Sequence, residues 1–500
     1  MTWFKTNWMG RWVIAGGLLG VGFVWPMLWM LGVVGIAYVI HLTLREQSYK
    51  RLLVGSVVAW TIKSALALVW FWSVYPIEWL AIGLGGLQLL LISVWWLTAA
   101  LWLGLGGIVF GGGVKLAQQY LSTAGLFLTI PFIWILAELS GSIVFSIITI
   151  GAGGTITTAF SFGYVGYLAT QHELLIQVAR ISGVYSLGFL IVLLAAAAVW
   201  VWQYKTGYKP FVYMLVTVFI LTSFVSTRNN IEPIAGASYT VAIIDTAFPL
   251  LELRSADGRK AAREKLEEAM QTALALQTDY ILLPEDARYF SQHQDAALVG
   301  AQFAFRSNNQ NVVIVDSGRA GADEKVVLQS FVYNGVNQLI DQSQKRYLVP
   351  QGEFMPALYA GALRLAGQGA VVEQVTQSLA YEVGSDLNQA DYATGSPGVL
   401  FCFESVKPWG VRQIMQERGD VPFVAHPVSH AWFHQPQTLW HQLDSMLRVQ
   451  AIWNQQYIVS AGNHVRGYAV TPAGTIVYPQ SVASGDNWHV GVLTVPKVDR

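Results

Sequence analysis

Apolar runs long enough to cross a membrane dominate the first 230 residues of the chain. A helix needs roughly 20 apolar residues to cross a hydrocarbon core about 30 Å thick, so each such run bounded by charges or turn residues is a candidate span. This criterion gives seven candidates, 10–25, 26–43, 52–74, 79–110, 124–147, 180–203 and 209–227. The sequence therefore predicts a multi-pass α-helical membrane domain of about seven spans.

Charge is divided unevenly between two parts of the chain. Residues 1–230 hold 11 Lys and Arg against 4 Asp and Glu, whereas residues 231–500 hold 19 against 26. Only 12% of all residues are charged and 54% are apolar. This apolar content excludes a disordered chain. The lack of a basic face excludes a nucleic-acid-binding protein. We expect a membrane domain over 1–230 and a separate domain over 231–500.

Lysines and arginines in short loops predict the orientation of the spans. They cluster before the first span, after the second, after the fourth and between the last two (Lys5, Arg11; Arg45, Lys50, Arg51; Lys115; Lys205, Lys209). With seven spans and a cytoplasmic N-terminus, all four clusters lie on the cytoplasmic side. The second domain then emerges on the outer face, and the chain is expected to end there because no later run is long enough to span.

Polar residues inside the spans are few, which makes Lys63 and Glu138 candidates for function. The alternative is that Lys63 reaches the headgroups or pairs inside the bundle, while Glu138 lies near the outer interface. Residues 148–172 are first rich in glycine and then in aromatic side chains (Phe160, Phe162, Tyr164, Tyr167). We expect this segment to rest on the membrane surface.

From about residue 238, short β-rich runs alternate with amphipathic helices. We predict a helix over 259–276 and strands at 239–244, 280–283, 311–315, 325–333, 398–403, 422–425, 457–460 and 490–495. This alternation predicts a single α/β domain with a sheet covered by helices. Ligands in such domains usually sit beyond the carboxyl ends of the strands.

Three reactive side chains stand near predicted strand ends, namely Glu285, Lys345 and Cys402. A thiol attacks as the thiolate, which needs a base to take its proton and a positive charge to favour the anion. Glutamate supplies the base, and the lysine ammonium supplies the charge and could stabilise an oxyanion. Spacing alone leaves this weak, because a lone cysteine is more often a small buried hydrophobe. Cys402 is the one cysteine of the sequence, so no disulfide framework is expected.

The residues that flank these three side chains form segments that resemble known motifs. Residues 283–285 read Leu-Pro-Glu, 345–353 read Lys-Arg-Tyr-Leu-Val-Pro-Gln-Gly-Glu and 401–404 read Phe-Cys-Phe-Glu. They resemble, in this order, the three signature segments of the nitrilase, or carbon-nitrogen hydrolase, superfamily. With seven predicted spans upstream, the chain resembles the membrane-bound apolipoprotein N-acyltransferase family of that superfamily. Further similar segments are 132–138, 173–190 and 430–441.

The resemblance implies the fold and the site of the outer domain. It implies an α-β-β-α sandwich over 231–500 in which Glu285, Lys345 and Cys402 form a catalytic triad and Glu353 supports the lysine.

Two more residues are candidates for a supporting or substrate-binding role. Glu404 is expected to orient Lys345 or a substrate amine, with a strand-end salt bridge as the alternative. Trp432, together with Phe433, Phe354 and Met355, is expected to line an acyl or lid surface, with a place in the core as the alternative.

The resemblance also implies an activity. A phospholipid would donate an acyl chain to the cysteine, and the thioester would acylate the N-terminal amine of a diacylglyceryl-cysteine lipoprotein. The enzyme would lie in the bacterial cytoplasmic membrane with its catalytic domain on the outer, periplasmic side. We expect a monomer that binds no nucleic acid and needs no cofactor or metal, because the nine histidines show no zinc spacing and no phosphate-binding glycine loop follows a strand.

Two other hypotheses remain open. A membrane-anchored amidase or nitrilase would use the same triad to hydrolyse a small amide, and it would not need a site that opens at membrane level and excludes water. A transporter or scaffold with an inactive outer domain is disfavoured by the intact triad and by the lack of an obvious inverted repeat.

The sequence departs from the family pattern at several positions. Gln351 replaces the usual Phe of the Pro-Phe-Gly-Glu turn, and Asp-Thr-Ala at 245–247 replaces Gln-Gly-Asn. Gln450 and Trp453 stand where Arg and Glu are frequent, and a final span common in the family is not found. These changes leave the triad intact and bear on the acceptor and the docking surface.

Overall fold

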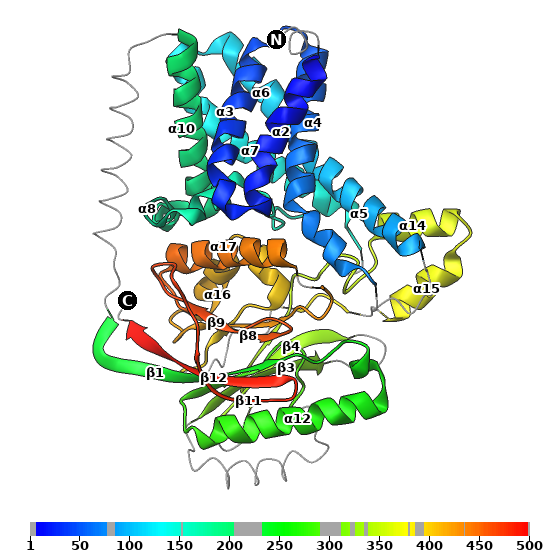
Figure 1. The fold of residues 1–500 in the computed structure, drawn as a ribbon, viewed down its shortest axis with the longest axis vertical. Coiled ribbons are helices and arrows are strands. Elements are labelled where there is room, and N and C mark those ends of the chain that lie inside the picture. The colour runs from blue at the N-terminus through cyan, green and yellow to red at the C-terminus, as the bar shows by residue number, and fades with distance from the viewer. Residues whose placement is uncertain are drawn as a thin grey trace.

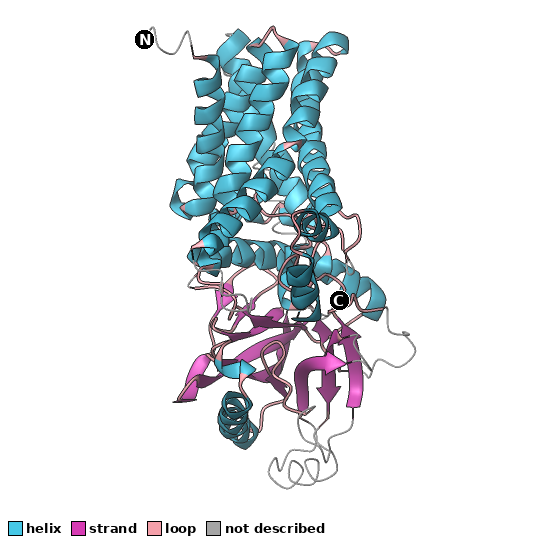
Figure 2. Ribbon diagram, turned by 90° about the vertical axis from the view of Figure 1, so that its right-hand side faces the viewer, coloured by secondary structure: helices cyan, strands magenta, loops and turns pink. Residues whose placement is uncertain are grey.

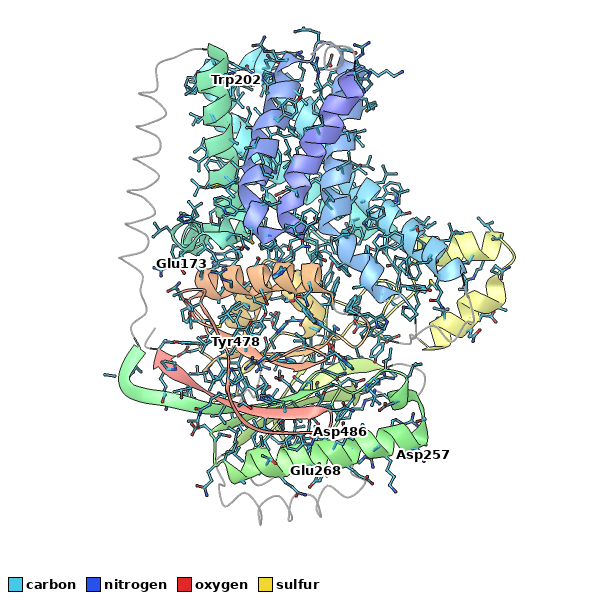
Figure 3. The ribbon with its side chains drawn as sticks, viewed as in Figure 1. Glu173, Trp202, Asp257, Glu268, Tyr478 and Asp486 are labelled. Atoms are coloured by element: carbon cyan, nitrogen blue, oxygen red, sulfur yellow. The ribbon has the colours of Figure 1, made fainter. Side chains whose placement is uncertain are left out.

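The structure is a computed structural model. It describes residues 7–77, 86–151, 154–204, 233–290, 312–320, 326–334, 339–378, 381–385, 395–434 and 436–498. A bundle of helices lies at one end of the long axis and a sheet-containing domain at the other (Figure 1). In Figure 3, the acidic residues Asp257, Glu268 and Asp486 lie at the end of the sheet-containing domain, and Trp202 lies at the far tip of the bundle.

The bundle is built from the N-terminal helices. They are α2 (Trp8–Val24), α3 (Trp29–Arg45), α4 (Tyr49–Ala67), α5 (Leu87–Gly104), α6 (Gly106–Tyr120), α7 (Thr123–Ile148) and α10 (Val184–Tyr204), with short α8 (Glu173–Ile176) and α9 (Ala179–Ser182) and 3₁₀ helices η1 (Pro26–Leu28), η2 (Val69–Val74) and η3 (Val165–Gln171). Among the described residues, four helical stretches are long and apolar enough to cross a membrane: Pro26–Arg45, Gln88–Tyr120, Thr123–Ile148 and Val184–Gln203. The predicted helical, apolar N-terminal region is confirmed.

The predicted spans agree with most of these helices, but the count of seven stays a prediction. The predicted span 209–227 lies outside the described residues. The predicted span 79–110 is not one straight helix, because α5 ends at Gly104 and α6 starts at Gly106. The helices pack closely at this break: a Cβ at Gly106 would lie 2.2 Å from the carbonyl oxygen of Ala137. Glycines here let α6 approach α7 closely, as is common where membrane helices cross.

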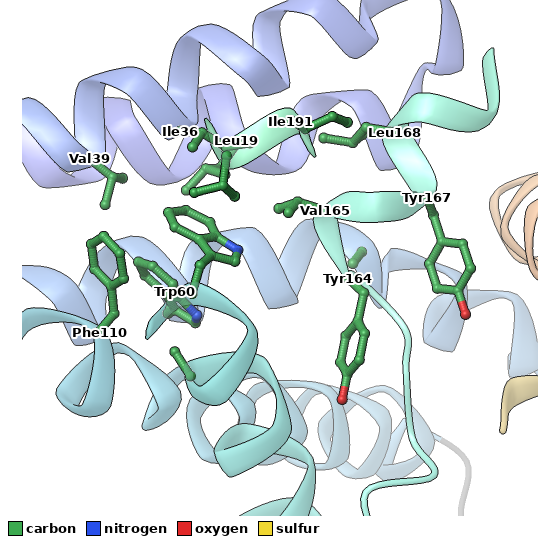
Figure 4. Packing of buried hydrophobic residues seen from close by; sticks show 14 of the residues in the cluster. Leu19, Ile36, Val39, Trp60, Phe110, Tyr164, Val165, Tyr167, Leu168 and Ile191 are labelled. Carbon is green, nitrogen blue, oxygen red and sulfur yellow. The ribbon is translucent and has the colours of Figure 1, made fainter. Parts of the chain in front are cut away.

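The aromatic segment after α7 does not lie on the membrane surface as predicted. Phe160, Phe162, Tyr164 and Tyr167 are all buried. Figure 4 shows Val165 and Leu168 of η3 pointing toward Leu19, Ile36 and Ile191 of the bundle. The segment's polar groups reach the outer domain instead, since Ser161 Oγ donates to the Val406 carbonyl (2.6 Å) and Thr170 Oγ1 lies 2.9 Å from Ser445 Oγ.

The outer domain contains strands in two layers. One layer holds β1 (Pro233–Thr246), β2 (Tyr280–Leu282), β3 (Val313–Ala320), β4 (Val327–Tyr333), β5 (Leu339–Gln344), β11 (Gln480–Gly485) and β12 (Trp488–Val498). The other holds β6 (Gly398–Val399), β7 (Val424–Ser429), β8 (Ile458–Asn463), β9 (Tyr468–Val470) and β10 (Ile476–Val477). In the described strands, the two layers share one ladder pairing, that of Thr246 in β1 with Asn463 in β8.

Alternation along the strands shows how the layers stack. In β1, Val241 and Ile243 enter a core shared with Val459 of β8, whereas Ala242 and Ile244 face helix α12. Ile458 of β8 faces the opposite way, toward α16 and α17. Successive strand residues point to opposite faces, so each sheet buries one face on the other sheet and one on helices. The predicted α-β-β-α sandwich is confirmed.

The helices of this domain are α12 (Ala256–Ala275), α14 (Ala357–Leu365), α15 (Gly369–Ser378), α16 (Gly410–Arg418) and α17 (Gln437–Asn454), with 3₁₀ helices η4 (Glu252–Arg254) and η6 (Cys402–Val406). α12 packs on one face of the sandwich and α16 and α17 pack on the other, whereas α14 and α15 lie to the side, near α5 (Figure 1). α17 lies between the sheets and the bundle, and α12 lies on the far face (Figures 1 and 2). The predicted domain boundary at residue 230 lies outside the described residues.

Candidate active site

Lys345 stands at the centre of the candidate site, directly after β5. Its Nζ lies 3.0 Å from Glu285 Oε1 and 2.6 Å from Glu353 Oε1. The three side chains are at most 8% exposed. Glu285 follows β2, so its position beyond the carboxyl end of a parallel strand is the one predicted from the sequence. The structure thus brings the predicted glutamate and lysine together.

The turn that carries Glu353 is held by its own side chain. Glu353 Oε2 accepts a hydrogen bond from the backbone N–H of Val349 (2.8 Å), so both carboxylate oxygens are bonded. Gln351 has a φ of 64°, a left-handed conformation that is costly for a side chain without local support. Its N–H donates to the carbonyl of Phe354 (2.9 Å) and supplies that support. This hydrogen bond comes from the backbone, so the turn is closed with Gln351 in place of the family's usual Phe.

Cys402 lies at the start of η6, one residue beyond Phe401 and close to the end of β6. Its Sγ is 3.9 Å from the carbonyl oxygen of Ser429, the last residue of β7. Its own carbonyl accepts from Ser405 Oγ (2.6 Å) and lies 3.3 Å from His426 Nε2. These contacts fix the backbone of the residue that carries the thiol.

Within the described residues, the Glu404 side chain bonds backbone N–H groups and neither Lys345 nor another basic side chain, while the predicted role toward a substrate amine stays a prediction. Its Oε1 accepts hydrogen bonds from the backbone N–H groups of Arg346 (2.8 Å) and Tyr347 (3.2 Å). Its Oε2 accepts from the N–H of Phe401 (3.1 Å). One buried carboxylate therefore ties the loop after the lysine to the residue before the cysteine. Such hydrogen bonds to a charged acceptor contribute about 1.5–3 kcal/mol each.

Burial sets the protonation of the site. Burial raises the pKa of Glu285 to about 7, although Lys345 opposes this shift. Burial and the nearby Glu285 charge raise the pKa of the Cys402 thiol above its usual range. Burial alone would lower the pKa of Lys345, but the carboxylates of Glu285 and Glu353 outweigh it and raise that pKa well above its usual value. The resting site therefore holds a protonated thiol, a charged ammonium and a carboxyl that titrates near neutrality.

A cavity of about 100 Å³ connects this site to the bundle. Glu285, Lys345 and Cys402 all line it. The opposite wall comes from the bundle and from the segment after α7, with Trp70, Phe71, Ile92, Trp95, Phe145, Phe160 and Phe162. Trp432 and Phe433 line it as well. Trp432 and Met355 also pack against a neighbouring apolar cluster that contains Ile77 and Ile92, so an acyl or lid surface stays a prediction for these residues. One cavity thus combines an apolar wall from the bundle with the reactive side chains of the outer domain.

Several residues that line this cavity could not be identified as site residues from the motifs of the outer domain. Ser429 ends β7 and His430 follows it, and both line the cavity. The similarity of 430–441 to the family marks this stretch, but it assigns no role to either residue. Trp70 and Phe71 lie beyond the end of α4, in η2. Their clustering with Trp72 at the outer end of a predicted span is the signal that could have identified them.

The other departures from the family pattern make structural contacts. Asp245 accepts hydrogen bonds from the N–H groups of Gly462 (2.9 Å) and Gly467 (2.8 Å), which holds the two strand layers together. Gln450 accepts from Val411 N–H (3.0 Å) and donates to the carbonyl of Ser405 (2.8 Å), which fixes η6 from α17. Among the residues that the structure describes, no three His, Cys, Asp or Glu side chains group in a way that could hold a metal ion.

Comparison with known proteins gives two similar curated sequences. The apolipoprotein N-acyltransferase of Geobacter metallireducens is 24% identical over 366 residues, which cover 66% of this chain and 64% of that protein. The apolipoprotein N-acyltransferase of Rickettsia typhi is 22% identical over 342 residues, with 64% and 63% covered. The matches thus span somewhat less than two thirds of these relatives, and no family model matches the chain. The predicted resemblance to this family is confirmed.

Solved structures similar to this chain include members of the nitrilase superfamily. An amidase from Nesterenkonia sp. AN1, with an acetamide moiety on its active-site cysteine, aligns at a TM-score of 0.31 and 15% identity, covering 53% of this chain and 93% of that one. Nit3 of Saccharomyces cerevisiae aligns at a TM-score of 0.36 and 16% identity, with 52% and 90% covered. TM-scores this low support no conclusion about activity.

Proposed function

Because the chain resembles apolipoprotein N-acyltransferases, we propose that it is a phospholipid-dependent N-acyltransferase that acts through a Cys402 thioester. Its substrates are a membrane phospholipid as acyl donor and the N-terminal amine of a diacylglyceryl-cysteine lipoprotein as acceptor. The observation that carries the proposal is the shared cavity, in which the wall opposite Cys402 is apolar and comes largely from the helical bundle. A lipid acyl chain fits such a wall, whereas a small polar amide gains little from it.

The first half-reaction forms the thioester. Glu285 takes the proton of the Cys402 thiol, which is needed because that thiol has a raised pKa. The thiolate attacks the ester carbonyl of the phospholipid, and the Lys345 ammonium stabilises the oxyanion. The C–S bond forms, the C–O bond breaks, and the lysophospholipid leaves with the proton returned by Glu285.

The second half-reaction transfers the acyl chain. The acceptor amine attacks the thioester carbonyl, so that a C–N bond forms and the C–S bond breaks. Glu285 takes a proton from the attacking nitrogen and returns it to the Cys402 thiolate. Glu353 acts as a positioning residue, because its contact with Lys345 keeps the ammonium beside the reaction centre.

The membrane topology belongs to the same proposal. Lys115 Nζ donates to the backbone carbonyl of Glu46 (3.3 Å), so the clusters around Arg45, Lys50 and Lys115 gather at one end of the bundle. That end lies away from the outer domain (Figure 1). By the excess of positive charge in cytoplasmic loops, residues 231–500 lie on the outer, periplasmic side of the bacterial cytoplasmic membrane. We propose that the enzyme works there as a monomer, with the membrane domain within residues 1–230.

Mass spectrometry of the purified protein tests the proposal. After incubation with phospholipid, Cys402 should carry an acyl mass that hydroxylamine removes, and the Cys402→Ala variant should carry none. A diacylated lipopeptide should then discharge the thioester and gain an amide-linked chain.

Two results would contradict the proposal. Absence of any adduct with phospholipids of several headgroups would exclude the thioester. Discharge to water alone, with a free fatty acid as product, would favour the membrane-anchored hydrolase.

A further inference from the structure

A second cavity, of about 490 Å³, adjoins the first at the candidate site. Glu285, Glu353, Ser429 and Trp432 line both cavities. Cys402, in contrast, lines the apolar cavity and is not part of the wall of the larger one. The proposed base therefore faces two spaces, and the proposed nucleophile faces the space on the bundle side.

Arginines dominate the charged lining of this larger cavity. Arg259 and Arg263 come from the first turns of α12, Arg288 from the loop after β2 and Arg319 from the end of β3. Their aromatic and apolar neighbours include Tyr289, Tyr381, Leu253 and Leu266. Arginine is the side chain best suited to bind carboxylates, because its planar fork donates two parallel hydrogen bonds.

The acidic residues of the lining already have basic partners. Asp286 binds Arg288 (2.7 Å between Oδ1 and Nε) and contacts Arg319 (3.4 Å). Glu285 and Glu353 both bind Lys345. Counted over its described residues, the lining holds four arginines against three carboxylates, and two of these carboxylates share a lysine that lies outside it. The cavity therefore favours an anionic ligand.

The position of the cavity separates it from the membrane. α12 covers the face of the sandwich that is farthest from the bundle (Figures 1 and 2). The end near Arg259 and Arg263 thus lies away from the bundle, while the end at Glu285 and Glu353 lies beside the candidate site. A molecule that fills the cavity runs from the reaction centre into the aqueous side.

We propose that this cavity binds the acidic peptide segment that follows the N-terminal amine of the acceptor. The inference rests on the proposed function and assigns a substrate feature to it. The donor chain occupies the apolar cavity, where Cys402 is reached from the bundle side. The acceptor amine reaches the thioester where the two cavities adjoin, beside Glu285, which lines both spaces. The lipid of the acceptor stays in the membrane, and its peptide extends toward α12.

The test separates the two half-reactions. Two synthetic diacylated lipopeptides differ only in whether aspartates or lysines follow the acylated cysteine. The Arg263→Glu and Arg259→Glu variants should form the thioester at the wild-type rate, which shows that they are folded. Their kcat/KM for discharge to the aspartate peptide should fall roughly five- to tenfold, as expected for loss of a charged contact, and the value for the lysine peptide should rise.

A matched control lies on the same helix. Lys260 belongs to α12 but not to the lining, its side chain is 77% exposed, and Lys260→Glu makes the same change of charge. This variant should discharge both peptides like the wild type.

Three outcomes distinguish the possibilities. No thioester in the wild type contradicts the proposed function itself. A normal thioester with equal discharge of both peptides by every variant overturns the inference and leaves the function standing. Slower thioester formation from an anionic phospholipid, with unchanged discharge, assigns the cavity to the donor headgroup and also overturns the inference.

Discussion

Within the described residues, a lysine is buried against glutamate in two places, and the two sites differ in their surroundings. In the bundle, Lys63 Nζ lies 3.4 Å from Glu138 Oε1, and this carboxylate also accepts from Trp134 Nε1 (3.2 Å) and the N–H of Val165 (2.9 Å). In the outer domain, Lys345 lies between Glu285 and Glu353 on the wall of a cavity that also exposes a thiol. A buried ion pair alone therefore does not identify a reaction centre. The Lys345 site differs from the Lys63 site because it has an adjoining cavity and a thiol.

The bundle pair instead holds the chain together. Through Val165, Glu138 fixes the start of η3, and the aromatic segment containing η3 contacts both the bundle and the outer domain. The prediction that Lys63 pairs inside the bundle is confirmed, whereas Glu138 is enclosed by its partners. Breaking the Lys345 contacts should therefore reduce activity, whereas breaking the Lys63–Glu138 pair should reduce stability.

The largest effect is expected for Lys345→Met. This change removes the charge that stabilises the oxyanion and leaves two buried carboxylates without their partner. Thioester formation should slow by about 10³-fold or more. Single-turnover acylation, followed by mass spectrometry, measures this rate. A variant that acylates within tenfold of the wild type would show that Lys345 has only the structural role of Lys63.

The next largest effect concerns pH, which should distinguish the role of Glu285 from that of Glu138. Because burial raises the pKa of Glu285 to about 7, the carboxyl is increasingly protonated below neutral pH and cannot accept the thiol proton. The rate of thioester formation should fall below pH 7, by up to about tenfold per pH unit, and level off above it. Glu138→Gln should keep this midpoint, whereas the residual activity of Glu285→Gln should lose it. A midpoint near 4.5 in the wild type would contradict the assignment of Glu285 as base.

An intermediate effect is expected for Glu404→Gln. An amide keeps one acceptor oxygen and places an NH₂ group against a backbone N–H that the carboxylate bonds at present. We expect a loss of about 1–3 kcal/mol in the free energy of unfolding. Thioester formation should slow by roughly tenfold, because the lysine and cysteine loops lose their link.

Glu417→Gln is the control for this change. Glu417 binds the partly exposed Arg346 side chain on the same loop, so its loss should cost less than about 1 kcal/mol. Equal effects of the two substitutions, in denaturation and in acylation, would show that the Glu404 contacts carry no special weight.

The smallest effect on activity is expected for Lys63→Met. This change leaves Glu138 buried without its ammonium, which should lower the free energy of unfolding by about 3–5 kcal/mol. The folded fraction should nevertheless acylate Cys402 at the wild-type rate, since Lys63 does not line the apolar cavity. Thermal unfolding in detergent and acylation per folded molecule measure the two parts. Loss of acylation in folded protein would indicate that the bundle pair contributes to the reaction.

The sequence predicts the two-part architecture because both parts have strong local signals. The apolar runs predict the positions of most of the described apolar helices. Alternating residues such as Val241 and Ala242 predict the two faces of β1. The motifs predict a triad of Glu285, Lys345 and Cys402, and the structure brings Glu285 and Lys345 into contact and places Cys402 on the same cavity.

The rest depends on contacts between distant segments. Glu404 bonds backbone groups 57 and 58 residues away, and no local pattern records that geometry. The aromatic residues at 160–167 have the composition of an interfacial segment, yet they are buried because the outer domain and the bundle close over them. The arginine-lined cavity joins α12, β2 and β3, whose arginines are unremarkable within their own elements.

The single cysteine has a consequence for oxidative damage. A thiol oxidised to sulfenic acid is usually rescued by a second thiol, and within these 500 residues Cys402 has no such partner. Peroxide reacts with the thiolate, whereas the raised pKa of Cys402 keeps the resting side chain as the neutral thiol. In the proposed mechanism, burial makes Cys402 depend on Glu285 for its ionisation, and the same burial protects the thiol between turnovers. An enzyme that faces an oxidising compartment would gain from a thiol that ionises only when a substrate is bound.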